Sequence, residues 1–354
     1  MSDSYLGENL IFVISQPRSG STLLQRILFG HPDVQTSAET WLMLHPVYGL
    51  RKTGFSAEYG SQFACEGVEE FLENYTHGHE VYLDAIREWA RTIYQDAIQK
   101  HQKRYFLDKT PRYFFIIPEL FKLFPKAKFV FLLRNPMAVL ASELSTYVKG
   151  DWPVLGIFNA DLISAPGWIL DGIELLGERG YSIHYERFVS DPENAIRALC
   201  DYLELDFHEH MLDYSGTPKP LGRYNDPTGI NQHTRASTGS VEKWKDMVND
   251  DQSLHFAQRY LAGLGEDTIR KLGYDYQELF NTLHSRTVSP NRLYPWSIAI
   301  QPESLWTFRQ QFTSDLYFNR KACGQFKGTL ATLKTHLLNV LRVIRRELSS
   351  PDDT

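Results

Sequence analysis

The stretch FVISQPRSGSTLLQRIL, residues 12–28, has the layout of a phosphate-binding loop between a strand and a helix. The apolar run at residues 10–15 is typical of a buried parallel strand. After residue 22, apolar residues recur at the spacing of one helix face. A polar turn containing Gly20 lies between the two patterns. The stretch therefore predicts a strand, a tight turn and a helix, with a candidate anion site at the turn.

The residues of this turn favour an anion other than a nucleoside triphosphate. Backbone N–H groups at a helix N-terminus converge on one point, and the helix dipole adds partial positive charge there. Arg18 supplies a guanidinium, and Ser19, Ser21 and Thr22 supply hydroxyl donors. The residue after Gly20 is not the lysine of an NTPase loop. The alternative is an ordinary strand-to-helix turn with a surface arginine.

Strand-like and helix-like patterns alternate through the first half of the chain. RYFLD before Lys109, KFVFLL before Arg134 and YSIHY ending at Tyr185 indicate further strands. Pro136 and Pro192 lie where helices are expected to begin, the second behind Asp191 as N-cap. This alternation predicts an α/β fold, a three-layer sandwich with a central, mostly parallel sheet.

The pattern predicts one main domain and a C-terminal extension. We expect the domain at 1–280, with a helical insert at about 50–100 and an active-site loop at 211–240 that is rich in turn residues. The extension, 281–354, carries an amphipathic helix. Its apolar stripe consists of Leu330, Leu333, Leu337, Leu341 and Ile344. The first interpretation of this stripe is that the helix docks onto the chain's own core. The second is a homodimer contact, and the third is a helix on a membrane surface.

Composition narrows the class of protein. The net charge of −6 over 354 residues gives no global basic field for nucleic acid. Cys65, Cys200 and Cys323 form neither a disulfide framework nor a metal-binding pattern. The sequence shows no signal-peptide pattern and no run of about 20 apolar residues. We therefore expect a soluble, cytoplasmic protein without a transmembrane segment.

A second motif, FVFLLRNPMAVLASEL at residues 129–144, supports the anion site. Arg134 ends the expected strand, and Ser142 lies six residues after Pro136 in the following helix. Six residues of helix span roughly 9 Å, which lets Arg134 and Ser142 converge on one phosphate. Taken alone, the motif favours the alternative, in which Arg134 is an exposed strand end and Ser142 a neutral helix residue.

Together the two motifs resemble those of sulfotransferases that use 3′-phosphoadenosine 5′-phosphosulfate (PAPS). PRSGSTLLQRIL resembles their 5′-phosphosulfate loop, and RNPMAVLAS resembles their 3′-phosphate motif. The sequence is similar to tyrosylprotein sulfotransferases and to sulfotransferase domains of polyketide synthases over residues 10–276, apart from the insert. The resemblance implies a P-loop-like sulfotransferase fold and transfer of a sulfuryl group from PAPS to a hydroxyl, without a metal.

The resemblance also assigns donor-binding roles. It implies that the loop residues cradle the 5′-phosphosulfate and that two further residues grip the 3′-phosphate. It places three others, with gaps in the local match, against the adenine or a nucleotide phosphate. The loop residues are Arg18, Ser19, Gly20, Ser21 and Thr22; Arg134 and Ser142 hold the 3′-phosphate; Tyr185, Ser237 and Lys243 complete the set. For Tyr185, a strand-end core aromatic is the alternative.

Three residues are catalytic by the same resemblance. Glu39, in HPDVQTSAET, matches a general base, and an attacking hydroxyl needs such a group to accept its proton. Lys109, in LDKTPRY, matches a lysine beside the transferring group, where it would stabilise charge on the leaving oxygen. His233 matches a loop histidine that acts as a second acid or base or orients the substrate. The alternatives are a solvated carboxylate for Glu39, with the neighbouring Asp108 structural, and a solvated side chain for His233.

The sequence does not identify the molecule that accepts the sulfuryl group. A small-molecule alcohol or phenol, a carrier-bound hydroxyacyl chain, a sugar and a peptide tyrosine all fit. A nucleotide-dependent kinase and a non-catalytic nucleotide-binding regulator are the other classes considered. The missing loop lysine argues against the kinase, and the presence of both Glu39 and Lys109 argues against the regulator.

Overall fold

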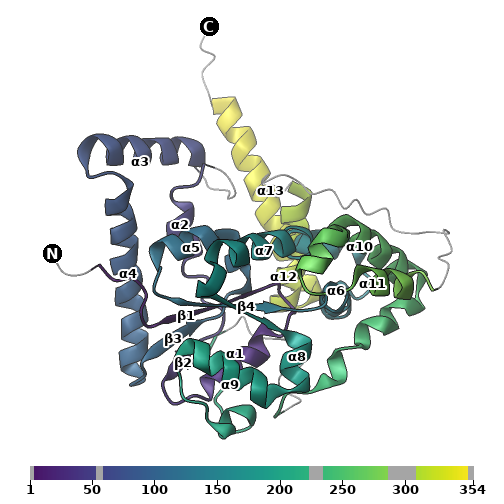
Figure 1. Cartoon of the computed structure of the whole chain (residues 1–354). Helices are drawn as coiled ribbons and strands as arrows, with labels where there is room; N and C mark the ends of the chain where they lie inside the picture. The colour runs from purple at the N-terminus through teal and green to yellow at the C-terminus, as the bar shows by residue number, and fades with distance from the viewer. Residues whose placement is uncertain (1–3, 53–58, 223–233, 286–307, 350–354) are drawn as a thin grey trace.

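A parallel sheet forms the centre of the computed structural model, which describes residues 4–52, 59–222, 234–285 and 308–349 (Figure 1). Within these ranges it contains five strands in the order β2-β3-β1-β4-β5, and every neighbouring pair is parallel. The strands are β1 Leu10–Ser15, β2 Val34–Thr36, β3 Tyr105–Asp108, β4 Lys128–Leu133 and β5 Gly180–His184. The predicted α/β class and parallel sheet are confirmed.

The strands are apolar because both faces of the sheet are covered. Every residue of β1 is buried, as expected for a central parallel strand. Because successive side chains point to opposite faces, Phe12 and Ile14 belong to one core cluster and Ile11 and Val13 to another. The three layers predicted from the alternation are therefore present.

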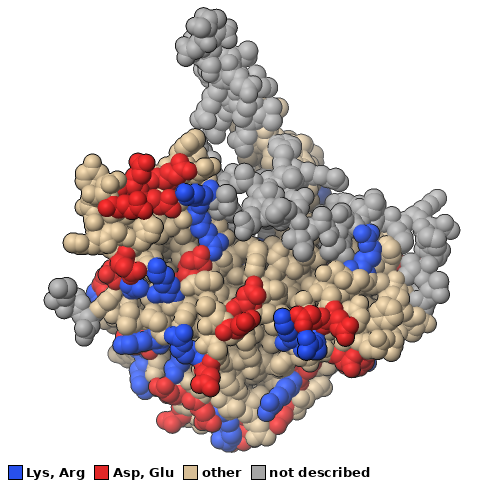
Figure 2. All heavy atoms as spheres, turned by 45° about the horizontal axis from the view of Figure 1, so that its top comes forward, with Lys and Arg blue, Asp and Glu red and all other residues tan. Residues whose placement is uncertain are grey.

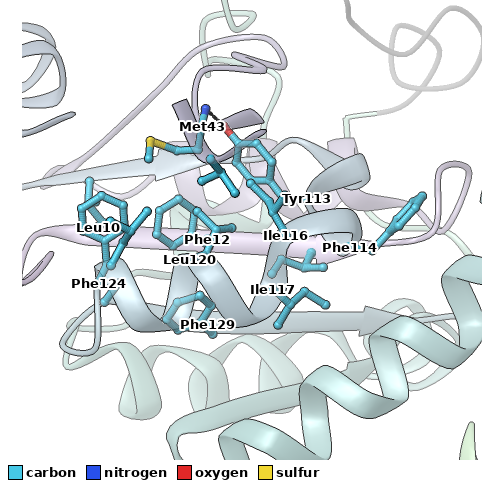
Figure 3. Close-up of a cluster of buried hydrophobic side chains, with 14 of the residues drawn as sticks. Leu10, Phe12, Met43, Tyr113, Phe114, Ile116, Ile117, Leu120, Phe124 and Phe129 are labelled. Carbon is cyan, nitrogen blue, oxygen red and sulfur yellow. Dashed lines mark hydrogen bonds between the residues drawn. The ribbon is translucent and has the colours of Figure 1, made fainter. Parts of the chain in front are cut away.

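One face is covered by an aromatic-rich layer (Figure 3). Phe12 of β1 packs against Phe129 of β4 and against Phe124, with ring centroids 5.4 and 5.9 Å apart. In the same close-up the hydroxyl of Tyr113 accepts a 3.1 Å hydrogen bond from the backbone N–H of Met43. The elements of this side include η1 Pro111–Ile116, α5 Ile117–Leu123, α4 His79–Lys100 and α7 Ala165–Leu176, with η5 Gly177–Arg179 following α7. This layer fixes the chain that follows β3, where Lys109 lies.

The opposite face is covered by three helices. They are α1 Ser21–Phe29, α8 Tyr185–Ser190 and α9 Pro192–Leu203, with η6 Glu209–Leu212 beside α1 and α9. The backbone N–H of Asn194 donates to the Asp191 side chain, which confirms the predicted N-cap of α9. Tyr185 is the first residue of α8 and does not end a strand, because β5 ends at His184. The strand expected from the sequence is therefore too long at this end.

A helical subdomain packs beside β4 and carries Ser142. It is built on α6 Pro136–Glu143, which begins at the predicted proline, with Asn135 accepting a 2.9 Å bond from the Met137 N–H. The other members are η2 Leu144–Val148, η3 Trp152–Phe158, η4 Ala160–Ser164, η7 Thr238–Ser240, η8 Lys243–Asn249, α10 Asp251–Lys271 and α11 Tyr276–Leu283. Both η2 and η4 are π-helical turns, which occur often at functional sites.

Helices also fill much of residues 44–100. They are α2 Leu44–Tyr48, α3 Ser61–Tyr75 and the long α4. Figure 1 shows α3 projecting from the upper end of α4, away from the sheet. In Figure 2, acidic side chains gather where α3 lies, and charges of both signs are interspersed over the rest of the visible face.

The extension forms a helical hairpin, α12 Phe308–Cys323 and α13 Gln325–Ser349 (Figure 1). α12 packs against η3, so the extension contacts the main domain through α12. The predicted stripe on α13 is not docked on the core: Leu330 and Leu337 are each 60% exposed, and Leu333 and Leu341 51%. Instead α13 turns Thr332 and His336 toward α12, where His336 meets Asp315 at 2.9 Å. The side chain of Ile344 lies outside the described set.

Two further observations concern membranes and metals. No helix in the described ranges is both long and apolar enough to cross a bilayer. Within the same ranges, no group of three or more His, Cys, Asp or Glu side chains is placed to hold a metal ion.

Candidate active site

The candidate residues lie just beyond the carboxyl ends of the strands. Glu39 follows β2, Lys109 follows β3, the 16–20 loop follows β1, Arg134 follows β4 and Tyr185 follows β5. Because all five strands are parallel, these residues share one edge of the sheet, the edge at which open α/β sheets bind ligands. From β2 to β4 is three strand spacings, roughly 14 Å. The sheet therefore gathers the candidates along one strip.

The loop after β1 has the backbone of an anion-binding turn. Arg18 has φ +69° and Gly20 has φ +93°, both left-handed, a backbone conformation that occurs in anion-binding turns. A Cβ on Gly20 would lie 2.5 Å from the Tyr185 ring, so only glycine fits against that ring. The hydroxyl of Ser19 is buried and has no hydrogen-bond partner in the described part of the chain. A buried hydroxyl without a partner at such a turn is suited to donate a hydrogen bond to a bound anion.

The two predicted anion motifs meet at Arg18. Its Nε donates a 3.1 Å hydrogen bond to Ser142 Oγ. Arg134 donates from one terminal nitrogen to the Arg18 carbonyl at 2.8 Å and from the other to the Ser240 carbonyl at 3.1 Å. The Nε of Arg134 is buried without a partner among the described residues. Arg134 thus supports the loop backbone and retains one N–H for a ligand.

Tyr185 holds Arg134 through its ring. The Arg134 guanidinium lies 4.2 Å from the centroid of the Tyr185 ring, and the Tyr185 hydroxyl is 2.7 Å from Ser240 Oγ. Burial lowers the pKa of Arg134, and the nearby Tyr185 and Glu186 oppose that effect. Sequence reasoning missed Ser240, which contacts both side chains and lies three residues beyond Ser237.

Glu39 and Lys109 form an ion pair at the other end of the strip. Lys109 Nζ lies 3.1 Å from Glu39 Oε1, and the lysine side chain is only 1% exposed against 23% for the glutamate. Buried charged side chains are usually paired with an opposite charge, and Glu39 is the partner of Lys109 here. The two residues assigned to catalysis are therefore in direct contact.

Asp108 holds this pair in place. Its carboxylate is fully buried and accepts hydrogen bonds from Thr40 at 2.7 Å, Tyr94 at 2.7 Å, Tyr113 at 2.9 Å and Thr110 at 3.1 Å. Burial raises its pKa, and the four hydroxyl donors oppose that shift. The structural role expected for Asp108 is thus observed, and the contact with Thr40 ties the segment carrying Glu39 to the segment carrying Lys109.

A second buried polar cluster, missed by sequence reasoning, lies beside Ser142. Arg112 donates from Nε to Asp161 at 2.9 Å and from a terminal nitrogen at 2.5 Å. Neither carboxylate oxygen of the buried Glu143 has a hydrogen-bond partner in the described ranges. Burial raises the pKa of Glu143 to about 8; Asp161 adds to the shift, and Arg18 and Arg112 oppose it. Arg112 lies in the LDKTPRY motif and Glu143 follows Ser142, but nothing in the sequence pointed to Asp161.

The remaining predicted residues are less closely placed. Ser237 is exposed and its hydroxyl accepts from the Gly239 N–H at 3.2 Å. Lys243 is exposed at the start of η8, which packs against α6. His233 lies outside the described residues. The described start of the 211–240 loop does reach the site, because Ala38 donates a 2.8 Å backbone bond to Leu221 next to Glu39.

Comparison with known proteins agrees with the class that this geometry defines. A sequence model of the sulfotransferase family matches residues 10–209, more than half of the chain. The chain belongs to the sulfotransferase family. The predicted class, a sulfotransferase, is therefore confirmed, and the kinase alternative is not supported.

Individual relatives show how far the similarity extends. Nodulation protein NoeE of Sinorhizobium fredii is 34% identical over 75% of this chain, and the match spans 66% of NoeE. A putative protein-tyrosine sulfotransferase of Caenorhabditis briggsae is 27% identical over 74% of this chain and 90% of the relative. Among solved structures, the sulfotransferase domain of the Synechococcus PCC 7002 olefin synthase is 26% identical over 69% of this chain and 90% of that domain, with a TM-score of 0.47.

Proposed function

We propose that this chain transfers a sulfuryl group from PAPS to a hydroxyl acceptor by in-line displacement. The observation that carries the proposal is the order of groups along the sheet edge. The Glu39–Lys109 pair follows β2 and β3, the anion-binding loop follows β1, and Arg134 follows β4. In this order, PAPS would bind with its phosphosulfate group over β1 and β3 and with its 3′-phosphate toward α6.

The residues at the loop fit the donor. The orphan hydroxyl of Ser19, the N–H groups of the turn and the Arg18 guanidinium present donors to the 5′-phosphosulfate. The unpartnered Nε of Arg134 and the Ser142 hydroxyl would bind the 3′-phosphate. In this proposal Arg18 and Ser142 give up their mutual hydrogen bond when the donor binds. Arg18 then contacts the 5′-phosphosulfate and Ser142 the 3′-phosphate. Tyr185, Ser237 and Lys243 would complete the nucleotide site.

Glu39 acts as the general base. Its carboxylate accepts the proton of the acceptor hydroxyl as that oxygen bonds to sulfur and the bond from sulfur to the 5′-phosphate oxygen breaks. Lys109 donates to the departing oxygen and stabilises the charge that develops there. Their contact in the structure supports this, because a lysine held between the base and the leaving group can serve both. His233 would remain a second acid or base or an orienting residue.

An assay of sulfuryl transfer tests the proposal. Labelled PAPS is offered with a panel of alcohols, phenols, sugars and tyrosine peptides to the wild type and to Glu39→Gln. We expect the variant to lose roughly 10²–10⁴-fold in kcat, the usual contribution of a general base. Glu193→Gln, on the exposed Arg197 pair, is the matched control and should retain full activity. Full activity of Glu39→Gln would contradict the role of Glu39, and failure of the wild type on every acceptor would contradict the proposal.

A further inference from the structure

The extension and the domain together enclose a pocket next to the donor site. Its walls come from η2 and the chain after it, and from α12 of the extension. Its cavity volume is about 430 Å³, and part of the cavity opens to solvent. This size suits a small-molecule acceptor or one end of a larger one.

Tyr147 connects this pocket to the phosphosulfate loop. The Arg18 guanidinium lies 5.6 Å from the centroid of the Tyr147 ring, and Lys321 Nζ lies 5.8 Å from the same centroid. Tyr317 of α12 meets this ring edge-on at 6.2 Å. One aromatic side chain thus lies close to both a loop cation and a cation of the extension, so the pocket borders the donor site.

The lining of the pocket is cationic. Of the described residues that line it, Lys149, Arg320 and Lys321 are positive and only Asp151 is negative. Arg320 is oriented by the 2.9 Å hydrogen bond from its Nε to Thr329 of α13. In a protein of net charge −6, a concave site with this excess of cations favours an anionic ligand.

We propose that this pocket is the acceptor subsite and that it binds an oxyanion group, such as a carboxylate, phosphate or sulfate, carried by the acceptor. The inference rests on the proposed function, which already assigns the donor's own phosphates to the loop, Arg134 and Ser142. It gives the extension a role in the site: α12 supplies the cations Arg320 and Lys321 and the aromatic wall of Tyr317. The acceptor is then held by its anion while its hydroxyl extends past Arg18 toward the Glu39–Lys109 pair.

Three phenols with the same ring and different charges test this. They are 4-hydroxyphenylacetate, 4-ethylphenol and tyramine, assayed with labelled PAPS and, in parallel, for binding by calorimetry to the enzyme saturated with the product nucleotide. We expect the anionic phenol to exceed the neutral one by about tenfold in kcat/KM or affinity, and the cationic one to be the poorest, because a few partly exposed ion pairs contribute that much.

Lys321→Glu provides the decisive variant, because Lys321 is exposed and its change should leave folding intact. It should abolish or reverse the preference without changing the affinity for the product nucleotide. Lys327→Glu, an exposed lysine of α13 that does not line the pocket, is the matched control. No charge preference, binding of none of the phenols, or weakened nucleotide binding by Lys321→Glu would each overturn the inference. Charge-selective binding without any transfer would instead leave the subsite standing and contradict the proposed function.

Discussion

Thr40 Oγ1 donates a 2.7 Å hydrogen bond to the buried carboxylate of Asp108. Each of these residues is the immediate neighbour of a proposed catalytic group, Glu39 in one case and Lys109 in the other. The bond therefore sets the separation of the 3.1 Å ion pair from outside the site.

Asp108→Asn should damage both stability and catalysis. The amide retains one acceptor oxygen and adds two donors among four hydroxyls, so we expect a loss of about 1–3 kcal/mol in the free energy of unfolding. Urea denaturation and the kcat of sulfuryl transfer measure the two effects. Asp96→Asn, at an exposed position of α4, should change neither. An Asp108→Asn enzyme with unchanged kcat would show that the catalytic pair does not depend on this carboxylate.

Ser142→Ala should weaken recognition of the 3′-phosphate selectively. A hydrogen bond to a charged phosphate contributes about 1.5–3 kcal/mol, so the affinity for 3′-phosphoadenosine 5′-phosphate should fall roughly 10–100-fold. AMP, which lacks that phosphate, is the control ligand and should bind the variant as it binds the wild type. Titration calorimetry separates the two cases. Equal losses for both nucleotides would place Ser142 elsewhere on the donor.

Gly20→Ala should disable the loop. The left-handed φ of +93° and the 2.5 Å approach to the Tyr185 ring require both strain and a shift of the ring that supports Arg134. We expect a lower Tm and a loss of nucleotide affinity. Gly67→Ala is the control: this helical glycine has nothing within 4 Å of its Cβ position, and alanine should stabilise α3 by up to about 1 kcal/mol. A Gly20→Ala protein that binds the nucleotide normally would contradict the loop geometry.

Glu143→Gln should change how stability depends on pH. The pKa of Glu143 is raised from 4.5 to about 8 by burial, so the folded state holds a proton that the unfolded state releases between these values. The stabilisation is complete below pH 4.5 and is lost as pH rises toward 8, at up to about 1.4 kcal/mol per pH unit. Glutamine does not titrate. The free energy of unfolding of the variant, relative to that of the wild type, should therefore rise over this range and level off above pH 8.

Denaturation curves at several pH values measure that difference, in which the contributions of other groups largely cancel. A difference that stays constant from pH 5 to pH 9 would show that Glu143 is ionised in the folded protein. Glu178→Gln, at an exposed position in η5, should give a constant difference and serves as the control.

The fold class and the positions of most candidate residues along the chain follow from local features of the sequence. The apolar run of β1, the turn at Gly20 and the proline that begins α6 are local signals, and local propensity and hydrophobic periodicity act at short range. The loop residues, Arg134, Ser142, Glu39 and Lys109 could therefore be predicted from the sequence alone, because each directly follows a strand or lies in a recognisable motif. The end of β5 was predicted too late because nothing local distinguishes the end of a strand from the helix that begins at Tyr185.

Which of these residues contact one another depends on the tertiary structure. The contact of Arg18 with Ser142 joins positions 124 residues apart, and that of Arg112 with Asp161 joins positions 49 apart. The placement of α12 against Tyr147 likewise depends on packing between segments that share no local signal. Burial, unpartnered polar atoms and the pKa of Glu143 all follow from such long-range packing, because they depend on what surrounds a side chain and not on its neighbours in sequence.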